Sequence, residues 1–348
     1  MRRLAPMAIA IAAIAWLASG LLAADSLPGR LSDDEFWRLI EGFSEPNGTF
    51  RSENLLSNEL QYQRVLPALA SAAGPGRAYV GVGPEQNFTY IAALKPAVAF
   101  IVDIRRANLD LHLLYKALFE IAADRAEFVS RLFSRPMPPS AGAAASAREI
   151  FEALGAQSPN ERLYLETLAA VRNQLYTKHG FEIPEEDLRG IEYVFRAYFM
   201  LGPAIRYSPM GLTGGTVQPT YAQLMSATDD RGRAGAFLAT EEAFRVVKDL
   251  ESRNLVVPLV GNFAGGKTIR AVASYLTQKG TTVSAFYLSN VEEYLRPEGN
   301  WQAFCANAGS LPHDGASLFI RSSRSPTGDP ADGLLTEVGP LSAIATCR

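Results

Sequence analysis

The residues best suited to ligand chemistry lie within residues 78–108, where an apolar run leads into a glycine turn. Gly81 and Gly83 allow a tight turn, and their small size lets backbone N–H groups come close to a ligand. Asp103 follows about twenty residues later, at the end of a second apolar run. A carboxylate at this spacing can accept hydrogen bonds from the hydroxyl groups of a ribose or another diol. The pattern predicts a strand, a turn, a helix and a second strand at the edge of a binding cleft.

This order of elements is typical of one half of a Rossmann-type fold. The dinucleotide fingerprint G-x-G-x-x-G is incomplete, because Gln86 stands where the third glycine belongs. Class I S-adenosylmethionine methyltransferases have an acidic residue two positions before the first glycine, and this chain has Tyr79 there. The segments GVGPEQNFTY, AFIVDIRRAN and residues 259–295 nevertheless resemble an uncharacterised bacterial family of exported proteins with a methyltransferase-like domain. The resemblance implies that fold. It makes S-adenosylmethionine a candidate cofactor by resemblance only, and the residues themselves leave the cofactor unidentified.

Residues 1–24 predict a secretory signal peptide. Arg2 and Arg3 precede an apolar run that ends in Ala23 and Ala24. A positive start, a short apolar core and a small-residue exit are typical of such peptides, and the run is too short and alanine-rich for a membrane span. We therefore expect cleavage near Ala24, export to the periplasm or cell envelope, and no membrane span in the mature chain. Because sulfonium and nucleotide cofactors are made in the cytosol, a methyltransferase fold outside it does not imply methyltransferase activity.

Composition predicts a globular chain that can bury a sizeable core. The 348 residues are 48% hydrophobic and 20% charged, with a net charge of −3. The near-balanced charge without a basic stripe argues against nucleic acid as a partner. Further apolar runs over residues 255–260, 282–288 and 316–321 predict buried parallel strands. We expect one doubly wound α/β domain over residues 25–348 with a mostly parallel sheet.

The middle of the chain has the periodicity of helices. A long helix is expected over residues 109–133, followed by a helical insertion over about residues 136–220. Its helices are placed at 146–154, 160–179 and 191–200. The glycine-containing loop that follows, residues 203–219, is either a lid over the cleft or a solvated connector. A further helix is expected over 267–279.

Residues 261–268 match the phosphate-binding pattern G-x-x-x-x-G-K-[ST] letter by letter. In such a loop Lys267 would reach the terminal phosphates and Thr268 would hold magnesium. The next strand, however, ends in Ser289 rather than in a magnesium-binding aspartate. Nucleotide binding is therefore the alternative, and a plain strand-to-helix turn is preferred. That turn would place Asn262 and Phe263 in the same cleft as the first glycine turn.

Polar residues near the first turn complete the candidate ligand site. Glu59 precedes a helix expected over residues 60–69, where it is either a hydrogen-bond acceptor for a ligand or a favourable acid at a helix start. Asp103 is expected to be exposed, so that its loss would weaken ligand binding and leave fold stability nearly unchanged. Catalytic residues are not identified. The candidate ligand-binding residues are Glu59, Gly81, Gly83, Glu85, Gln86, Asn87, Asp103, Arg105, Asn262 and Phe263.

Other chemistry finds little support in the sequence. The histidines His112, His179 and His313 have no metal-ligand spacing, so no metal site is expected. Cys305 and Cys347 are expected to form a disulfide in an oxidising compartment, the alternative being two free thiols. Two function classes remain. One is a non-catalytic envelope protein that binds a small polar ligand in the cleft, and the other is an enzyme, methyltransferase-like if catalytic.

Overall fold

A mixed α/β fold surrounds a central six-stranded sheet in the computed structural model, which describes residues 26–142, 144–207, 218–324 and 334–347. The strand order is β3-β2-β1-β4-β5-β6. The first five strands of this order run parallel, and β6 pairs with β5 in the antiparallel direction. The strands are β1 (Ala78–Val82), β2 (Val98–Asp103), β3 (Val256–Val260), β4 (Val283–Ser289), β5 (Leu318–Arg324) and β6 (Leu334–Pro340).

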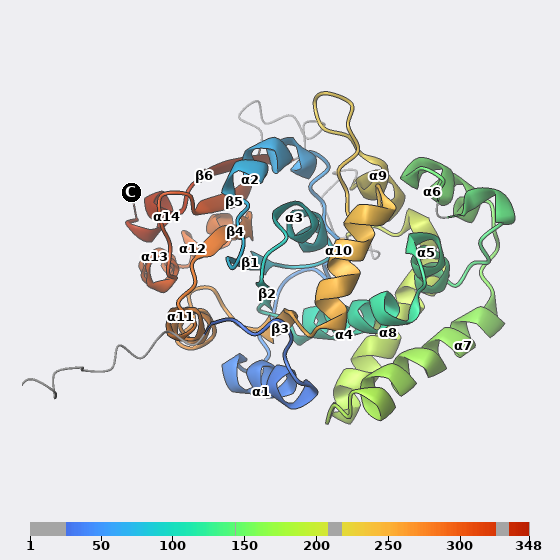
Figure 1. Ribbon diagram of the computed structural model, residues 1–348, viewed down its shortest axis with the longest axis horizontal. Coiled ribbons are helices and arrows are strands. Elements are labelled where there is room, and N and C mark those ends of the chain that lie inside the picture. The colour runs from blue at the N-terminus through green and yellow to red at the C-terminus, as the bar shows by residue number, and fades with distance from the viewer. Residues whose placement is uncertain (1–25, 143, 208–217, 325–333, 348) are drawn as a thin grey trace, which may run out of the picture.

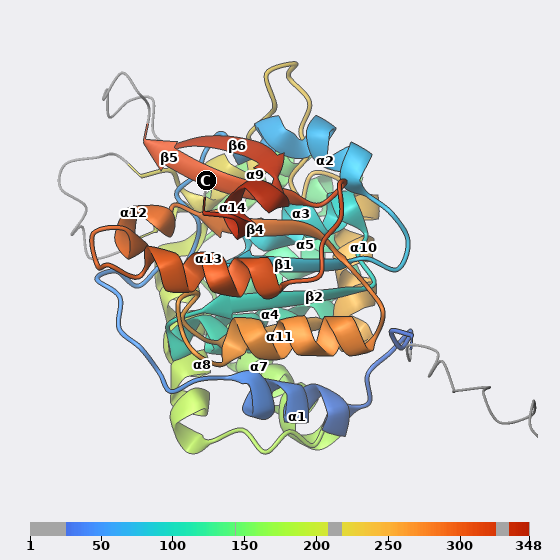
Figure 2. The same cartoon turned by 90° about the vertical axis from the view of Figure 1, so that its left-hand side faces the viewer.

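Helices cover both faces of this sheet (Figure 1 and Figure 2). On one face lie α11 (Thr268–Gln278) and α13 (Trp301–Ser310), and on the other lie α3 (Gln86–Leu94) and α10 (Glu241–Ser252). Because both faces are covered, β2 and β3 are buried along their whole length and consist almost entirely of apolar residues. The parallel strands predicted from the apolar runs are confirmed.

The connection from β2 to β3 contains a large helical part, which extends away from the sheet (Figure 1). It packs back on the sheet through α4, which contacts α8, α10 and β3. Besides α10, its α-helices are α4 (Arg106–Ile121), α5 (Arg125–Phe133), α6 (Ala147–Gly155), α7 (Glu161–Arg172), α8 (Glu185–Leu201) and α9 (Tyr221–Ser226). The 3₁₀ turns η2 (Pro139–Ala141) and η4 (Gly202–Ala204) and the π-helix η3 (Asn173–Lys178) join them.

Several expected elements were wrong in detail. The single helix over residues 109–133 is two helices, because Asp124 caps the start of α5 by accepting a hydrogen bond from the Glu127 N–H. The helix over 60–69 is instead the 3₁₀ turn η1 (Tyr62–Val65) followed by α2 (Leu66–Ala72). Strand β6 was not predicted, because its sequence LLTEVGP lacks a continuous apolar run. Most of its residues are half-buried in the structure.

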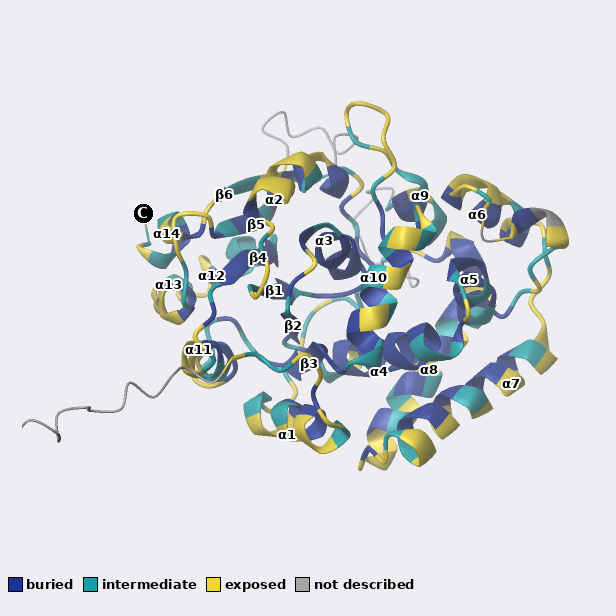
Figure 3. Ribbon diagram, in the orientation of Figure 1, coloured by how far each residue is buried: buried dark blue, intermediate teal, exposed yellow. Residues whose placement is uncertain are grey.

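The N-terminal helix α1 (Asp33–Phe43) was also not predicted, although its start is marked in the sequence. Ser32 and Glu35 form a reciprocal capping box there. The remaining helices are α12 (Glu292–Leu295) and α14 (Leu341–Ala345). The burial pattern shows α3 enclosed on nearly all sides, at the centre of the molecule (Figure 3). Such enclosure makes α3 a rigid support for the turn that precedes it.

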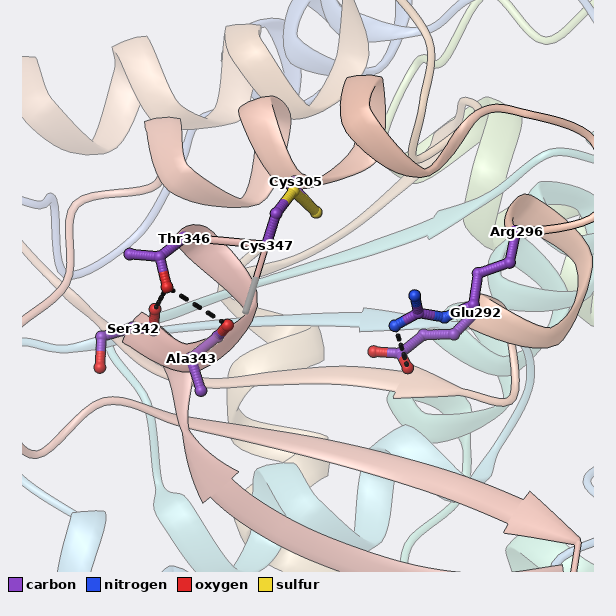
Figure 4. Close-up of a disulfide and its surroundings, with 7 residues drawn as sticks. All are labelled: Glu292, Arg296, Cys305, Ser342, Ala343, Thr346 and Cys347. Atoms are coloured by element: carbon purple, nitrogen blue, oxygen red, sulfur yellow. Dashed lines mark hydrogen bonds and ion pairs between the residues drawn. A yellow bond between two sulfur atoms is a disulfide. The ribbon is translucent and has the colours of Figure 1, made fainter.

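The C-terminal end of the chain is fastened to the body of the molecule by a disulfide. Cys305 in α13 is bonded to Cys347, just after α14 (Figure 4). The predicted disulfide is therefore confirmed. It holds α14 against α13, so the two helices cover this end of the sheet together.

Two predictions fall on residues that the structure does not describe. The signal peptide lies before residue 26, and most of the candidate lid lies within residues 208–217. Within residues 26–142, 144–207, 218–324 and 334–347, no helix has the length and apolar character needed to cross a membrane.

Candidate functional site

A cavity of about 150 Å³ opens at the carboxyl ends of the parallel strands. Four neighbouring strands contribute to its wall at or just past their ends, through Gly83, Asp103, Asn262 and Ser289. In the sheet, β1 lies between β2 and β4, so the chain order reverses there. Parallel α/β sheets bind ligands outside the carboxyl ends of their strands at such a reversal. The cavity therefore lies where this architecture places a ligand site.

Five of the predicted site residues line this one cavity. They are Gly83, Asp103, Arg105, Asn262 and Phe263. These residues converge because β1 pairs with β2, and β2 with β3, in the parallel direction. All three strands therefore end at the same edge of the sheet. The turn after β1 needs a glycine because Gly83 has φ of +76°, in the left-handed region.

Asp103 and Arg105 form a buried ion pair in the cavity wall. The Arg105 side chain donates from Nε to Oδ1 of Asp103 at 3.1 Å and from Nη2 to Oδ2 at 3.1 Å. The Arg105 N–H adds a bond to Oδ1 at 2.8 Å, and Nη1 donates to the Glu53 carbonyl. Asp103 is only 5% exposed, so the expectation of an exposed acid was wrong. The Arg105 side chain folds back over the Asp103 carboxylate and covers it.

The other predicted residues near the glycine turn shape the turn from behind and do not line the cavity. Asn87 donates from Nδ2 to the Val82, Gly83 and Pro84 carbonyls. A Cβ atom at Gly81 would lie 2.0 Å from Oδ1 of Asn87, so only glycine fits there. His112 contacts the Gly83 carbonyl through Nε2 at 2.9 Å, and burial lowers its pKa to about 4. His112 is therefore neutral and fixes the turn as a hydrogen-bond donor.

Glu85 and Gln86 join this turn to the segment over residues 49–58. Glu85 is fully buried and accepts the Ser57 N–H at 3.2 Å. Burial raises the pKa of Glu85 to about 8. Gln86 accepts the Ser57 hydroxyl and donates from Nε2 to Glu59 at 2.8 Å. Both side chains hold that segment, which closes one side of the cavity, in place.

Glu59 lies behind the cavity wall, 1% exposed, and does not reach the cavity itself. Its carboxylate accepts hydrogen bonds from Tyr287 at 2.9 Å, from Ser322 at 2.5 Å, from Ser289 and from Gln86. Of these donors, Tyr287 and Ser289 line the cavity. The structure does not place Glu59 in direct reach of a ligand. Instead, Glu59 orients the hydroxyl groups of Tyr287 and Ser289, which line the cavity and are within reach of a ligand.

Several cavity residues were missed by sequence reasoning. Tyr287 and Ser289 end β4, and the change from apolar to polar residues at a strand end was a usable signal. Ser289 also has φ of +50°, a conformation that non-glycine residues adopt rarely and often at functional sites. Aromatic rings make up much of the remaining wall. They belong to Phe50, Tyr207, Phe263, Tyr287 and Tyr294.

The loop over residues 261–268 binds an internal carboxylate in place of a phosphate. Glu45 accepts the N–H groups of Asn262 at 3.0 Å, Lys267 at 2.8 Å and Thr268 at 3.1 Å. The Lys267 ammonium donates to the Ser44 carbonyl, and the Thr268 hydroxyl bonds the Phe43 and Val260 carbonyls. The groups that a phosphate would need are thus engaged by residues 43–45 and by the end of β3.

Charge in the cavity wall is slightly negative. Among the described residues that line it, the charged side chains are Asp103, Arg105 and Glu298. Asp103 already pairs with the charge of Arg105, and three of the five guanidinium N–H groups are engaged, so Arg105 attracts a further anion only weakly. Within the described part of the chain, no group of three or more His, Cys, Asp or Glu side chains is placed to hold a metal ion.

The sheet and the cavity define a mixed α/β protein with a candidate ligand site at the carboxyl edge of a mostly parallel sheet. The chain belongs to a family described by a domain of unknown function, DUF7790, which matches residues 55–332. This match includes all four strand ends that form the cavity. A comparison with curated proteins gives no match.

Proposed function

We propose that this chain is an exported protein of the cell envelope whose cavity binds a small polar ligand. The observation that supports it most is the convergence of Gly83, the Asp103–Arg105 pair and Asn262 on one cavity at the edge where parallel sheets bind ligands. The strand order with an antiparallel strand at one edge supports a methyltransferase-like variant of the Rossmann-type fold. The arginine pair, apolar run and small-residue exit at the N-terminus support export.

The proposed ligand contains no phosphate. A phosphate needs unengaged amides or cations, and three amides of the 261–268 loop, those of Asn262, Lys267 and Thr268, already bind Glu45. The cationic residue in the cavity wall, Arg105, is engaged by Asp103 and the Glu53 carbonyl. Aromatic rings beside polar groups suit a compact ligand with an apolar face and several hydrogen-bonding groups.

Binding without methyl transfer is the preferred form of this proposal. In the fold that the sequence resembles, the acid after the second strand bonds ribose hydroxyls. Here both oxygens of Asp103 already accept hydrogen bonds from Arg105, which leaves less capacity for a diol. Together with the expected export away from the cytosol, this favours a binding protein over an S-adenosylmethionine-dependent enzyme.

Thermal unfolding with a ligand panel tests the proposal. The panel contains S-adenosylmethionine, adenosine, ATP with magnesium, monosaccharides and small amines. Asn262→Trp places a large ring in the cavity, and Gln278→Trp adds the same ring on the exposed side of α11 as a control. We expect at least one phosphate-free compound to stabilise the unsubstituted protein and the control but not Asn262→Trp. Stabilisation by no compound, or equal stabilisation of all three proteins, contradicts the proposal. Methyl transfer from labelled S-adenosylmethionine would favour the enzyme.

A further inference from the structure

Four hydrogen-bond donors surround the buried carboxylate of Glu59. Oε1 accepts from Tyr287 and Ser289, and Oε2 accepts from Gln86 and Ser322. A carboxylate has about four lone-pair positions, and these four donors match that number. Within the described residues Glu59 forms no ion pair, and its partners are all neutral. This acceptor-only group therefore lies directly behind the cavity wall.

This carboxylate fixes the direction of the hydroxyl groups in the wall. Because a carboxylate only accepts, the Tyr287 hydroxyl donates its hydrogen to Glu59. Ser289 does the same, since its other acceptor, Oδ1 of Asn290, is more distant at 3.5 Å. The same constraint extends to Ser57. Gln86 donates from Nε2 to Glu59 and to the Tyr90 hydroxyl, so its Oε1 faces Ser57 and accepts the Ser57 hydrogen. These three hydroxyls keep only lone pairs for a ligand.

Asn262, another residue of the cavity wall, offers a hydrogen-bond donor instead of an acceptor. Asn262 accepts the Ala264 N–H at its own Oδ1, which leaves Nδ2 as the donor that it offers in the cavity wall. One side of the cavity thus accepts hydrogen bonds in front of the buried Glu59 carboxylate, and the Asn262 side donates.

From this polarity we propose that the group bound at Ser289 and Tyr287 is a protonated amine. This proposal rests on the proposed function, since it names the chemical class of that ligand. An ammonium group supplies several donors to acceptor-only hydroxyls and places a positive charge near the unpaired Glu59. The charges in the wall, Asp103 and Glu298 against Arg105, favour a cation in the same way. Asn262 then accommodates an acceptor elsewhere on the ligand.

The test uses three small probes, each carrying one functional group, so it does not require the complete ligand to be known. These are ethylammonium, ethanol and acetate, titrated at equal ionic strength and followed by the backbone amide resonances of the residues around Ser289. We expect ethylammonium to saturate these shifts and acetate to leave them unchanged, with ethanol weaker than ethylammonium. A crystal soaked in ethylammonium should place its nitrogen within hydrogen-bond distance of Ser289 Oγ.

Variants separate charge from shape. In Glu59→Gln the amide supplies donors of its own and removes the charge, so ethylammonium affinity should fall at least tenfold. Ser289→Ala, which removes an acceptor and leaves Glu59 in place, covers the case in which Glu59→Gln does not fold, and should weaken binding severalfold. Ser284→Ala is the matched control, because Ser284 lies on the same strand β4 but donates to the Ala78 carbonyl and does not line the cavity, and it should leave affinity within about twofold.

Acetate binding at Ser289, equal binding of all three probes, or no ethylammonium binding overturns the amine proposal. These outcomes remain distinct from a failure of the proposed function. If the larger panel yields a neutral or anionic ligand that Asn262→Trp excludes, the cavity is a ligand site and the amine class is wrong. If the panel yields no ligand, the proposed function itself fails.

Discussion

Replacing Glu45 should destabilise the protein and free the amides of the 261–268 loop. The Glu45 carboxylate bonds three backbone N–H groups, at 3.0, 2.8 and 3.1 Å. A hydrogen bond to a charged group contributes about 1.5–3 kcal/mol. Glu45 is half-buried and Lys267 is exposed, so water can replace part of these bonds. We therefore take about 1 kcal/mol for each bond, a value below that range, and expect Glu45→Ala to lose about 3 kcal/mol.

Urea unfolding at neutral pH measures this loss. Glu45→Gln is the matched variant, because its single carbonyl oxygen keeps part of the interaction, and it should lose about half as much. Gly265 belongs to the same contact, since a Cβ there would lie 2.4 Å from Oε2 of Glu45. Gly265→Ala should consequently destabilise the protein by moving the carboxylate.

Inorganic phosphate tests whether Glu45 stands in for an anion. Without the carboxylate, the loop amides lie at the start of α11 and should attract an anion. At matched ionic strength, phosphate should raise the urea midpoint of Glu45→Ala more than that of the unsubstituted protein. The reasoning is refuted if Glu45→Ala is as stable as the unsubstituted protein, or if ATP with magnesium stabilises the unsubstituted protein and this effect disappears in Lys267→Ala.

Three further predictions concern stability. Reducing the Cys305–Cys347 disulfide should lower the free energy of unfolding by about 4 kcal/mol, as loop closure over a sequence separation of 42 implies, and urea unfolding with and without reductant checks this. Asp103→Ala should cost about 3–5 kcal/mol because it leaves Arg105 buried without its partner, and an unchanged urea midpoint would contradict this. Burial, and then the neighbouring carboxylate of Asp187, raise the pKa of Asp110 from 3.8 to about 8. Between these two values the folded state keeps a proton on Asp110 that the unfolded state has lost. Asp110 therefore lowers the free energy of unfolding progressively as the pH rises from about 4 to 8. In Asp110→Asn the urea midpoint should therefore fall less between pH 5 and 8 than in the unsubstituted protein. If the midpoints of the two proteins fall in parallel over this range, Asp110 does not titrate in this way.

The sequence predicted the central sheet because its signals are local. Apolar runs such as those of β2 and β3 are continuous only when helices cover both faces of a strand. Gly83 and Asp103 could be assigned to one edge, since parallel strands joined by crossovers end on the same side. Strand β6 escaped prediction because it is an antiparallel edge strand with half-buried residues, whose pairing depends on β5 rather than on its own pattern.

The cavity residues were predictable only where they adjoin a strand end already recognised. The burial of Asp103 depends on Arg105 folding back over it, and spacing alone does not reveal such a contact. Glu59 meets Ser289 and Ser322 across separations of 230 and 263 residues, so no local pattern connects them. The engagement of the 261–268 loop by Glu45 is likewise a contact between distant segments.

A crystal structure with the most stabilising compound of the ligand panel tests the central claim most directly. We predict that the compound occupies the cavity between Gly83, Asp103, Asn262 and Ser289, with a hydrogen bond to at least one of these residues. Density for the compound at any other place, with this cavity empty, would contradict the assignment of the ligand site.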